Sequence, residues 1–461
     1  LFGKKLTTQK FLESLRKLPG LNGKGTVERK VSIIVELLTS GSPVEAKYII
    51  RTLLGDLKVG IGSGILSDAI VECCFEPKEL DEKRKYGEIV QSAYDKTADF
   101  AEVFSRALSG LKNLESVDLS PGRPVKVMLY RKAKDIKEAF EIVGKPAAFE
   151  YKYDGFRMMI NKDENGKISI FTRRLDNVSK QFPDAVAYAR ENVKAESFII
   201  DCEAVGYNPL EKKYLPFESV SQRIKRKYDI EKMEKELPIE LNVFDIIYFN
   251  GRSLLNEFFL ERRKILEKIV KTAAWKIKLA QQIVTDSDAA AEKFYSQALK
   301  DGQEGLMAKN LNAIYKPGAR VGYGVKIKPD PNEFDLVIVG AEYGTGKRAG
   351  WLTSYDVSCR DKDGNLMEVC KVSTGLKEKP EEGLSFVEMT NELKKIIVSE
   401  DGKHVNVKPK IVVSIGYQNI QKSPSYSSGY ALRFPRVARL RPDRSVSDIV
   451  TIDEIRKEAE K

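Results

Sequence analysis

The sequence predicts a multidomain protein with an all-α domain over residues 1–120, an α+β domain over 121–330 and an all-β barrel over 331–461. Three observations lead to this division. The 461 residues are enough for two to four domains. Apolar residues recur at helical spacing in the first part, whereas strands and helices alternate in the second. In the third part short strands follow one another, which is typical of a small barrel.

The first part is expected to be helical. The stretches "PVEAKYIIRTLLGDL" and "YGEIVQSAYDKTADFAEVFSRAL" repeat apolar residues three and four positions apart. This spacing gives each stretch one apolar side when it is coiled as a helix. The pattern changes near Pro121, which we take as the start of the next domain.

The middle part alternates strands with helices. Stretches rich in Phe, Ile, Val and Tyr read as strands, namely "AAFEYKYDGFRMMI", "ISIFTRR", "SFIIDCEAV" and "IELNVFDIIYF". Two others, "FFLERRKILEKIVKT" and "DAAAEKFYSQALK", read as helices. After "KIKPDPNEF" the chain becomes mostly strands, with a helical insertion expected near "FVEMTNELKKIIV".

Composition narrows the function classes. The net charge is +11, and most of the surplus lies between residues 121 and 330. A locally basic region points to phosphate or nucleic acid, although a Lys/Glu-rich solvated surface, as in thermophile proteins, explains it equally well. Five cysteines without paired CxxC spacing indicate neither a zinc site nor a disulfide framework. His404 is the only histidine, which excludes chemistry that needs two histidines.

The stretch "FEYKYDGFR" places Lys152 in an otherwise apolar strand. A buried lysine is usually paired or extends its charged end to water. It becomes a nucleophile when burial and nearby cations favour its uncharged form. The stretch "VKIKP" offers Lys326 and Lys328, two residues apart and hence on one face of a strand. They could affect Lys152 and bind phosphate oxygens, whereas an edge strand protected by lysines is the competing interpretation.

Carboxylates recur at the ends of predicted strands. Asp201 and Glu203 lie in "FIIDCEAVGYN", and Glu304 precedes Gly305 in "DGQEGLMAKN". Each acid taken alone is explained by a turn or a cap. Two that converge could hold a hard cation such as Mg²⁺ together with phosphate oxygens. Phe244, in "VFDIIYFNG", could stack on a base or belong to the core.

The order of the motifs is more specific than any single one. "YKYDGFR", "FTRR", "DCEAV", "FDIIYFNG", "EGLMAK" and "VKIK" resemble the collinear motifs of covalent nucleotidyltransferases, which include ATP-dependent DNA ligases, RNA ligases and mRNA capping enzymes. "GSPVEAKYIIRTLLGDLKVGIG" is similar to the DNA-binding domain of archaeal and eukaryotic replicative DNA ligases. "DLVIVGAEYGTGKRAGWLTSYDVSCRD" is similar to the first strands of their OB-fold barrel, and "LRFPRVARLRPD" resembles their final motif. The resemblance implies an all-α DNA-binding domain, an α+β nucleotidyltransferase (adenylation) domain and an all-β OB-fold barrel.

The resemblance also implies roles for individual residues. Lys152 would attack the α-phosphorus of ATP, carry AMP and pass it to the 5′-phosphate of a nick. Glu150 would read the adenine amino group and Phe244 would stack on adenine, while Asp154 and Gly155 would shape the turn that holds Lys152. The resemblance further implies contacts with ribose or phosphate for Arg157 and Arg173, and with ribose and a metal for Glu203 and Glu304. It implies phosphate contacts for Arg320, Lys326 and Lys328, and contacts on the pyrophosphate side for Arg439, Arg441 and Asp443.

Further expectations follow from the same resemblance. ATP and Mg²⁺, with Mn²⁺ as a substitute, are the expected cofactors, and nicked duplex DNA and a sliding clamp the expected partners. The barrel would swing between steps on a linker near "KPDPNEF". We expect a monomer without membrane association, because no apolar run of about eighteen residues occurs. It would act in DNA replication, repair and recombination, in the cytoplasm of an archaeon or in a eukaryotic nucleus. Because the first residue is Leu1 rather than Met, an N-terminal piece is expected to be missing.

Two alternatives stay open. An RNA ligase or a capping enzyme would share the central motifs, but the helical first part argues against both. A non-catalytic clamp on duplex DNA would share the architecture, but the intact Lys-Asp-Gly-Arg set argues against it.

Overall fold

The structure is a computed structural model of residues 1–461. It describes residues 6–21, 23, 25–55, 57–215, 217–224, 230–330 and 332–460. The chain divides into two compact units, Leu1–Lys328 and Pro329–Lys461. The linker expected near "KPDPNEF" includes Pro331, which lies outside the described residues.

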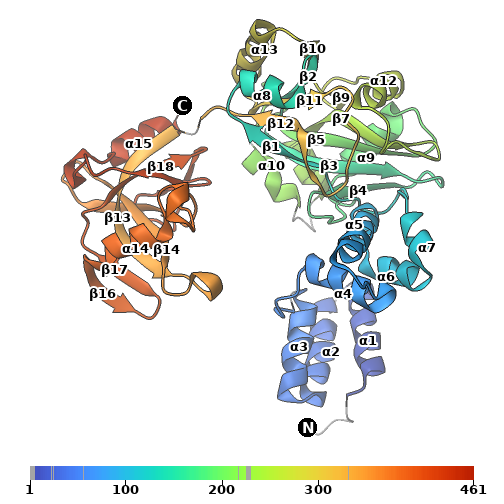
Figure 1. The fold of residues 1–461 in the computed structure, drawn as a ribbon, viewed down its shortest axis with the longest axis horizontal. Coiled ribbons are helices and arrows are strands. Elements are labelled where there is room, and N and C mark those ends of the chain that lie inside the picture. The colour runs from blue at the N-terminus through green and yellow to red at the C-terminus, as the bar shows by residue number, and fades with distance from the viewer. Residues whose placement is uncertain are drawn as a thin grey trace. The chain divides into compact units, whose positions relative to one another are not determined.

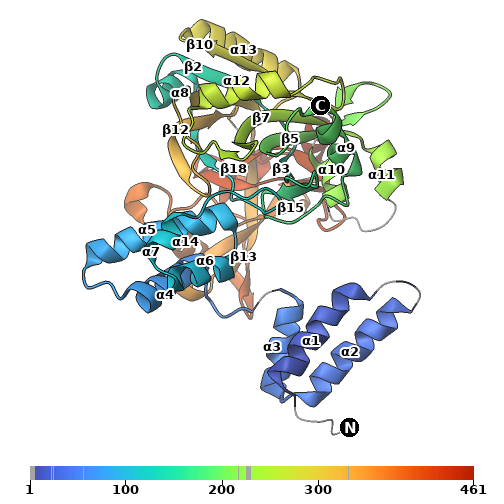
Figure 2. The same cartoon turned by 90° about the vertical axis from the view of Figure 1, so that its right-hand side faces the viewer.

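The first unit begins with helices, as the periodicity predicts. Ser42 accepts a hydrogen bond from the Glu45 N–H, and the Glu45 side chain accepts one from the Ser42 N–H, so this capping box starts a helix at Pro43. Figures 1 and 2 show the first three α-helices side by side. The helical elements are α1 (Thr8–Lys17), η1 (Leu18–Gly20), α2 (Thr26–Ser40), α3 (Pro43–Leu53), α4 (Ser63–Phe75), α5 (Leu80–Thr97), α6 (Phe100–Leu108) and α7 (Leu111–Glu115).

The rest of the first unit consists of two sheets and the helices that cover them. One has the strand order β1-β12-β11-β2-β10, and the other has the order β4-β3-β5-β7-β8, with β6 paired to β5 and β9 to β7. The strands of the first sheet are β1 (Leu129–Ala133), β2 (Ala147–Lys152), β10 (Gln282–Thr285), β11 (Gly305–Asn310) and β12 (Arg320–Ile327). Those of the second are β3 (Phe156–Lys162), β4 (Ile168–Thr172), β5 (Phe198–Asn208), β6 (Lys213–Tyr214), β7 (Ile239–Phe249), β8 (Arg252–Ser253) and β9 (Ile277–Leu279).

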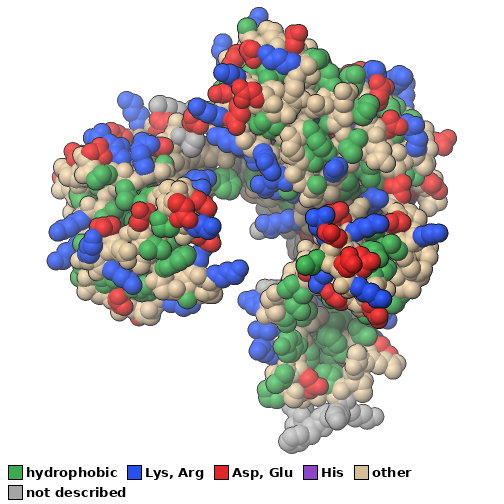
Figure 3. Space-filling model, in the orientation of Figure 1, with side chains coloured by type: hydrophobic (Ala, Val, Ile, Leu, Met, Phe, Trp, Pro, Cys, Tyr) green, Lys and Arg blue, Asp and Glu red, His purple; other side chains and the backbone are tan. Residues whose placement is uncertain are grey.

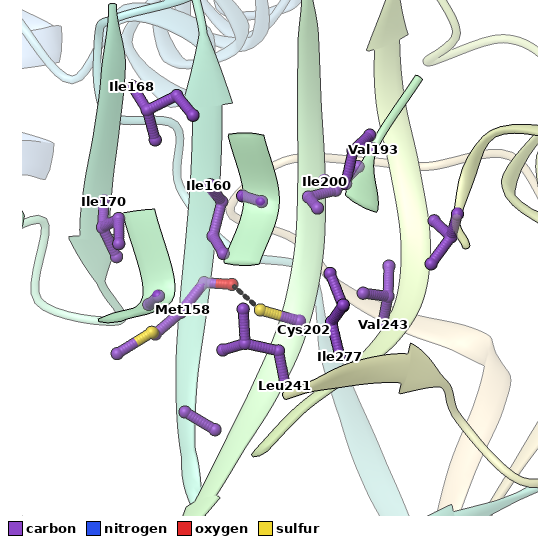
Figure 4. Close-up of a cluster of buried hydrophobic side chains, with 14 of the residues drawn as sticks. Met158, Ile160, Ile168, Ile170, Val193, Ile200, Cys202, Leu241, Val243 and Ile277 are labelled. Atoms are coloured by element: carbon purple, nitrogen blue, oxygen red, sulfur yellow. Dashed lines mark hydrogen bonds between the residues drawn. The ribbon is translucent and has the colours of Figure 1, made fainter. Parts of the chain in front are cut away.

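Helices cover one face of each sheet. Alternate residues of β3 and β5, among them Met158, Ile160, Ile200 and Cys202, enter the core beneath the helices of the second sheet (Figure 4). Their sequence neighbours therefore point to the opposite face. The helices are α8 (Ile136–Val143) and α13 (Asp288–Lys300) on the first sheet, α9 (Pro183–Asn192), α10 (Phe217–Ile224) and α12 (Phe259–Ile269) on the second, and α11 (Ile230–Glu236) between α10 and β7 in the sequence.

The stretch "AAFEYKYDGFRMMI", predicted as a strand, is divided between the two sheets. β2 ends at Lys152 and β3 begins at Phe156, and the two strands belong to different sheets. A Cβ on Gly155 would lie 2.4 Å from the Ala204 carbonyl oxygen. Only glycine permits so close an approach of two backbones. The break therefore places Lys152 at the junction of the two sheets.

The second unit is strand-rich. Its main sheet runs β15-β14-β13-β17-β16, with β18 paired to β13 and β21 to β18, and β19 pairs with β20. Met389 and Leu393 of one helix and Ile455 of another pack in its core, so the expected all-β character holds only in part. The predicted helical insertion is the first of these helices. The elements are β13 (Asn332–Tyr343), η2 (Gly346–Arg348), β14 (Leu352–Arg360), β15 (Leu366–Val372), η3 (Pro380–Glu382), α14 (Phe386–Lys394), β16 (Ile397–Asp401), β17 (His404–Val407), β18 (Val412–Tyr417), β19 (Ile420–Lys422), β20 (Tyr430–Leu432), β21 (Arg436–Leu440), η4 (Val446–Asp448) and α15 (Ile452–Ala459).

The surface and the helices bear on two sequence expectations. Among the residues that the structure describes, no helix has the length and apolar character needed to cross a membrane. On the face drawn in Figure 3, Lys and Arg side chains are interspersed with Asp and Glu over both units. The net positive charge therefore does not form a single-sign surface on this face.

Candidate active site

Lys152 is half-buried at the end of β2 and donates a hydrogen bond to the Glu304 carboxylate. The Glu304 backbone N–H donates to the Lys152 carbonyl at 2.9 Å, which holds the two residues together. The Nζ of Lys328 lies 2.5 Å from the same oxygen of Glu304. Burial raises the pKa of Glu304, but the two lysines outweigh burial, so the pKa is lowered overall. Glu304 is therefore a carboxylate shared by two lysines from separate motifs.

The turn after Lys152 is held from two sides. The Asp154 N–H donates to the Gln303 side chain at 3.4 Å, and the Asp154 carboxylate accepts from the Phe217 N–H at 3.4 Å. Gly305 has φ +136°, and a Cβ there would lie 2.1 Å from the Ile327 carbonyl oxygen. The Asp-Gly and Glu-Gly pairs of the motifs thus match backbone positions that exclude larger residues.

Three further cations lie near this pair of lysines. Burial lowers the pKa of Lys326, and the charges of Lys152, Lys328, Arg320 and Arg173 lower it further. Arg320 starts β12 and Arg173 follows β4, and both are exposed. The structure therefore brings the cations of three motifs, together with Arg320, into one electrostatic cluster, which suits a ligand with several phosphate charges.

Glu203, on β5, belongs to the same cluster. Burial raises the pKa of Glu203 to about 7, against the opposing charges of Lys152 and Arg157. Within the described part of the chain, no three His, Cys, Asp or Glu residues form a group that would hold a metal ion. The charge of Glu304 also raises the pKa of Glu203, so the two carboxyl groups lie near each other. Binding of a hard cation such as Mg²⁺ by this pair, with further ligands from substrate phosphate and water, stays a prediction.

Arg157 is engaged by the protein itself. Its Nε donates to Asp201 at 2.8 Å, its Nη2 bonds the other oxygen of Asp201, and its Nη1 donates to the Met128 carbonyl at 2.9 Å. The Tyr315 hydroxyl donates to Asp201 at 3.1 Å. Asp201 thus serves as the partner of Arg157, and contact of Arg157 with ribose or phosphate stays a prediction.

Glu150 is 1% exposed, although it is the residue expected to read the base. Lys309 lies 2.6 Å from one carboxylate oxygen, and Gln282 donates to the other at 2.8 Å. Phe244 is half-buried beside them, with the Lys309 Nζ 5.0 Å from its ring centroid. Sequence reasoning missed Lys309 and Gln282. Alternate residues of a strand lie on one face of the sheet, so the stretch "EGLMAKN" predicts Lys309 on the same face as Met307. No feature of the sequence singles out Gln282.

The final motif lies in the second unit, on and after β21. Arg441 binds Asp335 at 2.7 Å and Asp443 at 2.8 Å, and Arg439 binds Glu333 at 2.8 Å. The hydrogen bond from Arg441 lowers the pKa of Asp443 to about 2. The arginines are thus paired with carboxylates of their own unit, and their contact with pyrophosphate stays a prediction.

Comparison with known proteins agrees with the order of the motifs. The model of the "ATP dependent DNA ligase domain" matches residues 127–328, that of the "DNA ligase N terminus" matches 1–71, and that of the "ATP dependent DNA ligase C terminal region" matches 348–444. A DNA ligase of Nanoarchaeum equitans (strain Kin4-M) is 48% identical over 458 residues, which are 98% of this chain and 79% of that protein. The chain belongs to the ATP-dependent DNA ligases. The resemblance predicted from the motifs is therefore confirmed, together with the multidomain organisation.

Other matches support the same family. The DNA ligase of Thermococcus fumicolans is 41% identical over 456 residues, 98% of this ligase and 78% of that protein. The solved structure "Pmar-Lig_Pre." covers 95% of this ligase and 86% of its own chain, with a TM-score of 0.55 and 16% identity. At that identity the likeness shows the fold alone.

Proposed function

We propose that this ligase joins a 3′-hydroxyl to a 5′-phosphate at nicks in duplex DNA, through an AMP adduct of Lys152. The observation that supports this most is the cluster of Lys152, Glu304, Lys326 and Lys328. These residues come from three motifs far apart in the sequence, yet their charges act on one another. An amine nucleophile surrounded by phosphate-binding cations is what nucleotidyl transfer requires.

In the first proposed step, the Lys152 amine attacks the α-phosphorus of ATP after its ammonium has lost a proton to water. A nitrogen–phosphorus bond forms, the bond from the α-phosphorus to the bridging oxygen breaks, pyrophosphate leaves, and the nitrogen gives up a second proton to solvent. Lys326 and Lys328 bind phosphate oxygens and hold the nucleotide in line for attack. We propose Glu203 and Glu304 as ligands of Mg²⁺ or Mn²⁺, which when bound would neutralise phosphate charge.

Two further steps complete the reaction. An oxygen of the 5′-phosphate at the nick attacks the phosphorus of AMP, the phosphorus–nitrogen bond breaks, and Lys152 takes up a proton from solvent and leaves as an amine. The 3′-hydroxyl then attacks the 5′-phosphate, AMP leaves, and the hydroxyl proton passes to solvent. Arg439, Arg441 and Asp443 would act on pyrophosphate only in the first step, which requires the second unit to move between steps.

We assign residues 1–120 as a DNA-binding domain, 121–330 as the adenylation domain and 331–461 as an OB-fold domain. The helices up to Glu115, the two sheets and the strand-rich second unit support this division, as do the three matching family models. Nicked duplex DNA is the proposed partner of a monomer, with a sliding clamp as a further one. The matched relatives named above are archaeal, so we propose action in replication, repair and recombination in an archaeal cytoplasm.

The alternatives are less well supported. An RNA ligase or a capping enzyme does not explain the match of residues 1–71 to the DNA ligase N terminus. A non-catalytic clamp does not explain why Lys152, Asp154, Gly155 and Arg157 are all present where β2 passes into β3.

Labelling by ATP is the direct test. Purified protein is incubated with ATP labelled at the α-phosphate and a divalent metal, and is then separated on a denaturing gel and examined by mass spectrometry. We expect one added AMP at Lys152, and sealing of a nick in DNA in preference to RNA. Absence of the adduct with both Mg²⁺ and Mn²⁺ would contradict the proposal, and preferential sealing of RNA would favour an RNA ligase.

A further inference from the structure

A buried Lys–Glu pair, Lys309 and Glu150, lies beside Phe244, the residue expected to stack on the base. The Nζ of Lys309 is 2.6 Å from Oε2 of Glu150, and the two residues are 3% and 1% exposed. The ammonium also lies 5.0 Å from the ring centroid of Phe244 and 4.5 Å from that of Phe259. The two ring faces attract the ammonium, but a buried charge is still costly unless an opposite charge compensates it. Lys309 and Glu150 therefore depend on each other.

The second carboxylate oxygen of Glu150 is also engaged. Gln282, on the neighbouring strand β10, donates to Oε1 at 2.8 Å. The nearest other cation, Arg263, is 3.7 Å from Oε1, beyond ordinary hydrogen-bond length. A carboxylate has about four lone-pair directions, and Lys309 and Gln282 use one each. Glu150 therefore keeps the capacity to accept a hydrogen bond from a ligand.

The position of Glu150 relates this capacity to the nucleotide. Glu150 precedes Lys152 by two residues on β2, so both side chains lie on the same face of the sheet. Phe244, the expected stacking surface for the base, lies beside Lys309. A base stacked on Phe244, with its phosphates at Lys152, would present one edge toward Glu150.

We propose that Lys309, assisted by Gln282, is a positioning residue that holds Glu150 as a hydrogen-bond acceptor and so selects 6-amino over 6-oxo purine nucleotides. This inference rests on the proposed adenylation of Lys152. The amino group of adenine donates to an acceptor carboxylate, whereas the 6-oxo group of inosine or guanosine is itself an acceptor and would be repelled. Without Lys309, Oε2 of Glu150 would lose its partner, and only Oε1 would be held, by Gln282 at 2.8 Å and by Arg263 at 3.7 Å. The carboxylate would be less firmly oriented, and the discrimination would fall.

The test measures covalent labelling of the protein by each of three nucleotides. These are ATP, inosine triphosphate and purine riboside triphosphate, the last of which has no substituent at position 6 of the purine. We expect the wild-type protein to prefer ATP to both. Lys309→Met should reduce the preference for ATP over inosine triphosphate by about tenfold, the size of one charge-assisted hydrogen bond. The loss should lie in the nucleotide concentration needed for half-maximal labelling, rather than in the rate at saturation. Lys309→Arg keeps the charge and should stay close to wild type.

A second Lys–Glu pair, with a half-buried lysine and a buried glutamate, supplies the control. Lys278 lies 2.9 Å from Glu240 in the same unit, and Lys278→Met should leave the nucleotide preference unchanged. If Lys309→Met prevents folding, Gln282→Leu tests the same carboxylate and should shift the preference in the same direction. The inference fails if the variants that fold lose labelling by equal factors with all three nucleotides, or if the labelled wild-type protein does not discriminate among them. A wild-type protein that none of the nucleotides labels would instead overturn the proposed function.

Discussion

The Nζ of Lys328 lies 2.5 Å from Oε2 of Glu304, and the same oxygen accepts a hydrogen bond from Lys152. Glu304 immediately precedes β11, which lies between β2 and β12 and runs antiparallel to both. One carboxylate at the start of the central strand therefore reaches the lysines at the ends of both neighbours. Phosphate oxygens that bind these lysines must compete with Glu304 for them.

Lys152 is the first residue to test. Lys152→Ala and Lys152→Arg should both abolish labelling by ATP, because alanine has no amine and arginine stays protonated. Sealing of a nick that already carries AMP should survive in part, since that step does not use the lysine as a nucleophile. Gel-based labelling and sealing assays measure the two activities. Labelling of the alanine variant at another residue would refute the assignment.

Glu304 and Lys326 should respond differently to metal. Glu304→Ala should lose labelling activity that added Mg²⁺ or Mn²⁺ partly restores, because a weakened site is filled at higher metal concentration. Lys326→Ala removes a phosphate-binding cation and should not respond. Titration of both variants with metal measures the difference, and an equal response would show that the two roles are wrongly divided.

Glu203 should make stability depend on pH. Burial raises its pKa from 4.5 to about 7, so the native state binds the proton more tightly than the unfolded chain does. The stability that protonated Glu203 provides is fully present below about pH 4.5 and is lost as pH rises through about 7. Glu203→Gln cannot titrate at this position. The free energy of unfolding of the variant, minus that of wild type, should therefore increase as the pH rises from about 4.5 to about 7.

Denaturant unfolding without divalent metal, repeated between pH 4.5 and 8, measures this difference. Glu164→Gln at an exposed turn provides the control and should give a flat difference. A flat difference for Glu203→Gln as well would refute the raised pKa of Glu203.

Arg441 separates two interpretations of the final motif. If it acts on pyrophosphate, Arg441→Ala should lower labelling by at least about tenfold, the effect of one charge-assisted contact. Sealing of a nick that carries AMP should stay near normal. If the motif instead binds DNA, labelling by ATP should persist in Arg441→Ala. Sealing of the nick should then become weaker and more sensitive to salt. Because Arg441 also pairs with Asp335 at 2.7 Å, thermal unfolding must show that the variant is folded.

The buried pair of Arg262 and Asp245 should be important for stability. Both side chains are at most 2% exposed, and their closest atoms are 2.7 Å apart. Arg262→Met leaves the carboxylate unpaired and should cost about 3–5 kcal/mol of unfolding free energy. Lys264, on the same helix, pairs with Glu261 at the surface, and Lys264→Met should cost less than about 1 kcal/mol. Denaturant unfolding measures both, and similar losses would contradict the assumed effect of burial.

The sequence by itself determined the family, the order of the motifs and much of the local structure. The helices α3 and α13 lie where apolar spacing predicts them, because periodicity is a local property of the chain. Lys152 is recognisable because the Lys-Asp-Gly-Arg set lies within one short stretch, from Lys152 to Arg157. Gly155 and Gly305 are marked by their type, since both stand where another backbone approaches closely.

Only the tertiary structure decided how the motifs meet. It assigned β2 and β3 to different sheets, joined Arg157 to Asp201, and surrounded Glu150 with Lys309 and Gln282. Each of these contacts joins residues more than forty positions apart or depends on which strands are neighbours in a sheet. Strand pairing and the partners of buried charges are set by the packing of the whole domain, so no local pattern of residues encodes them.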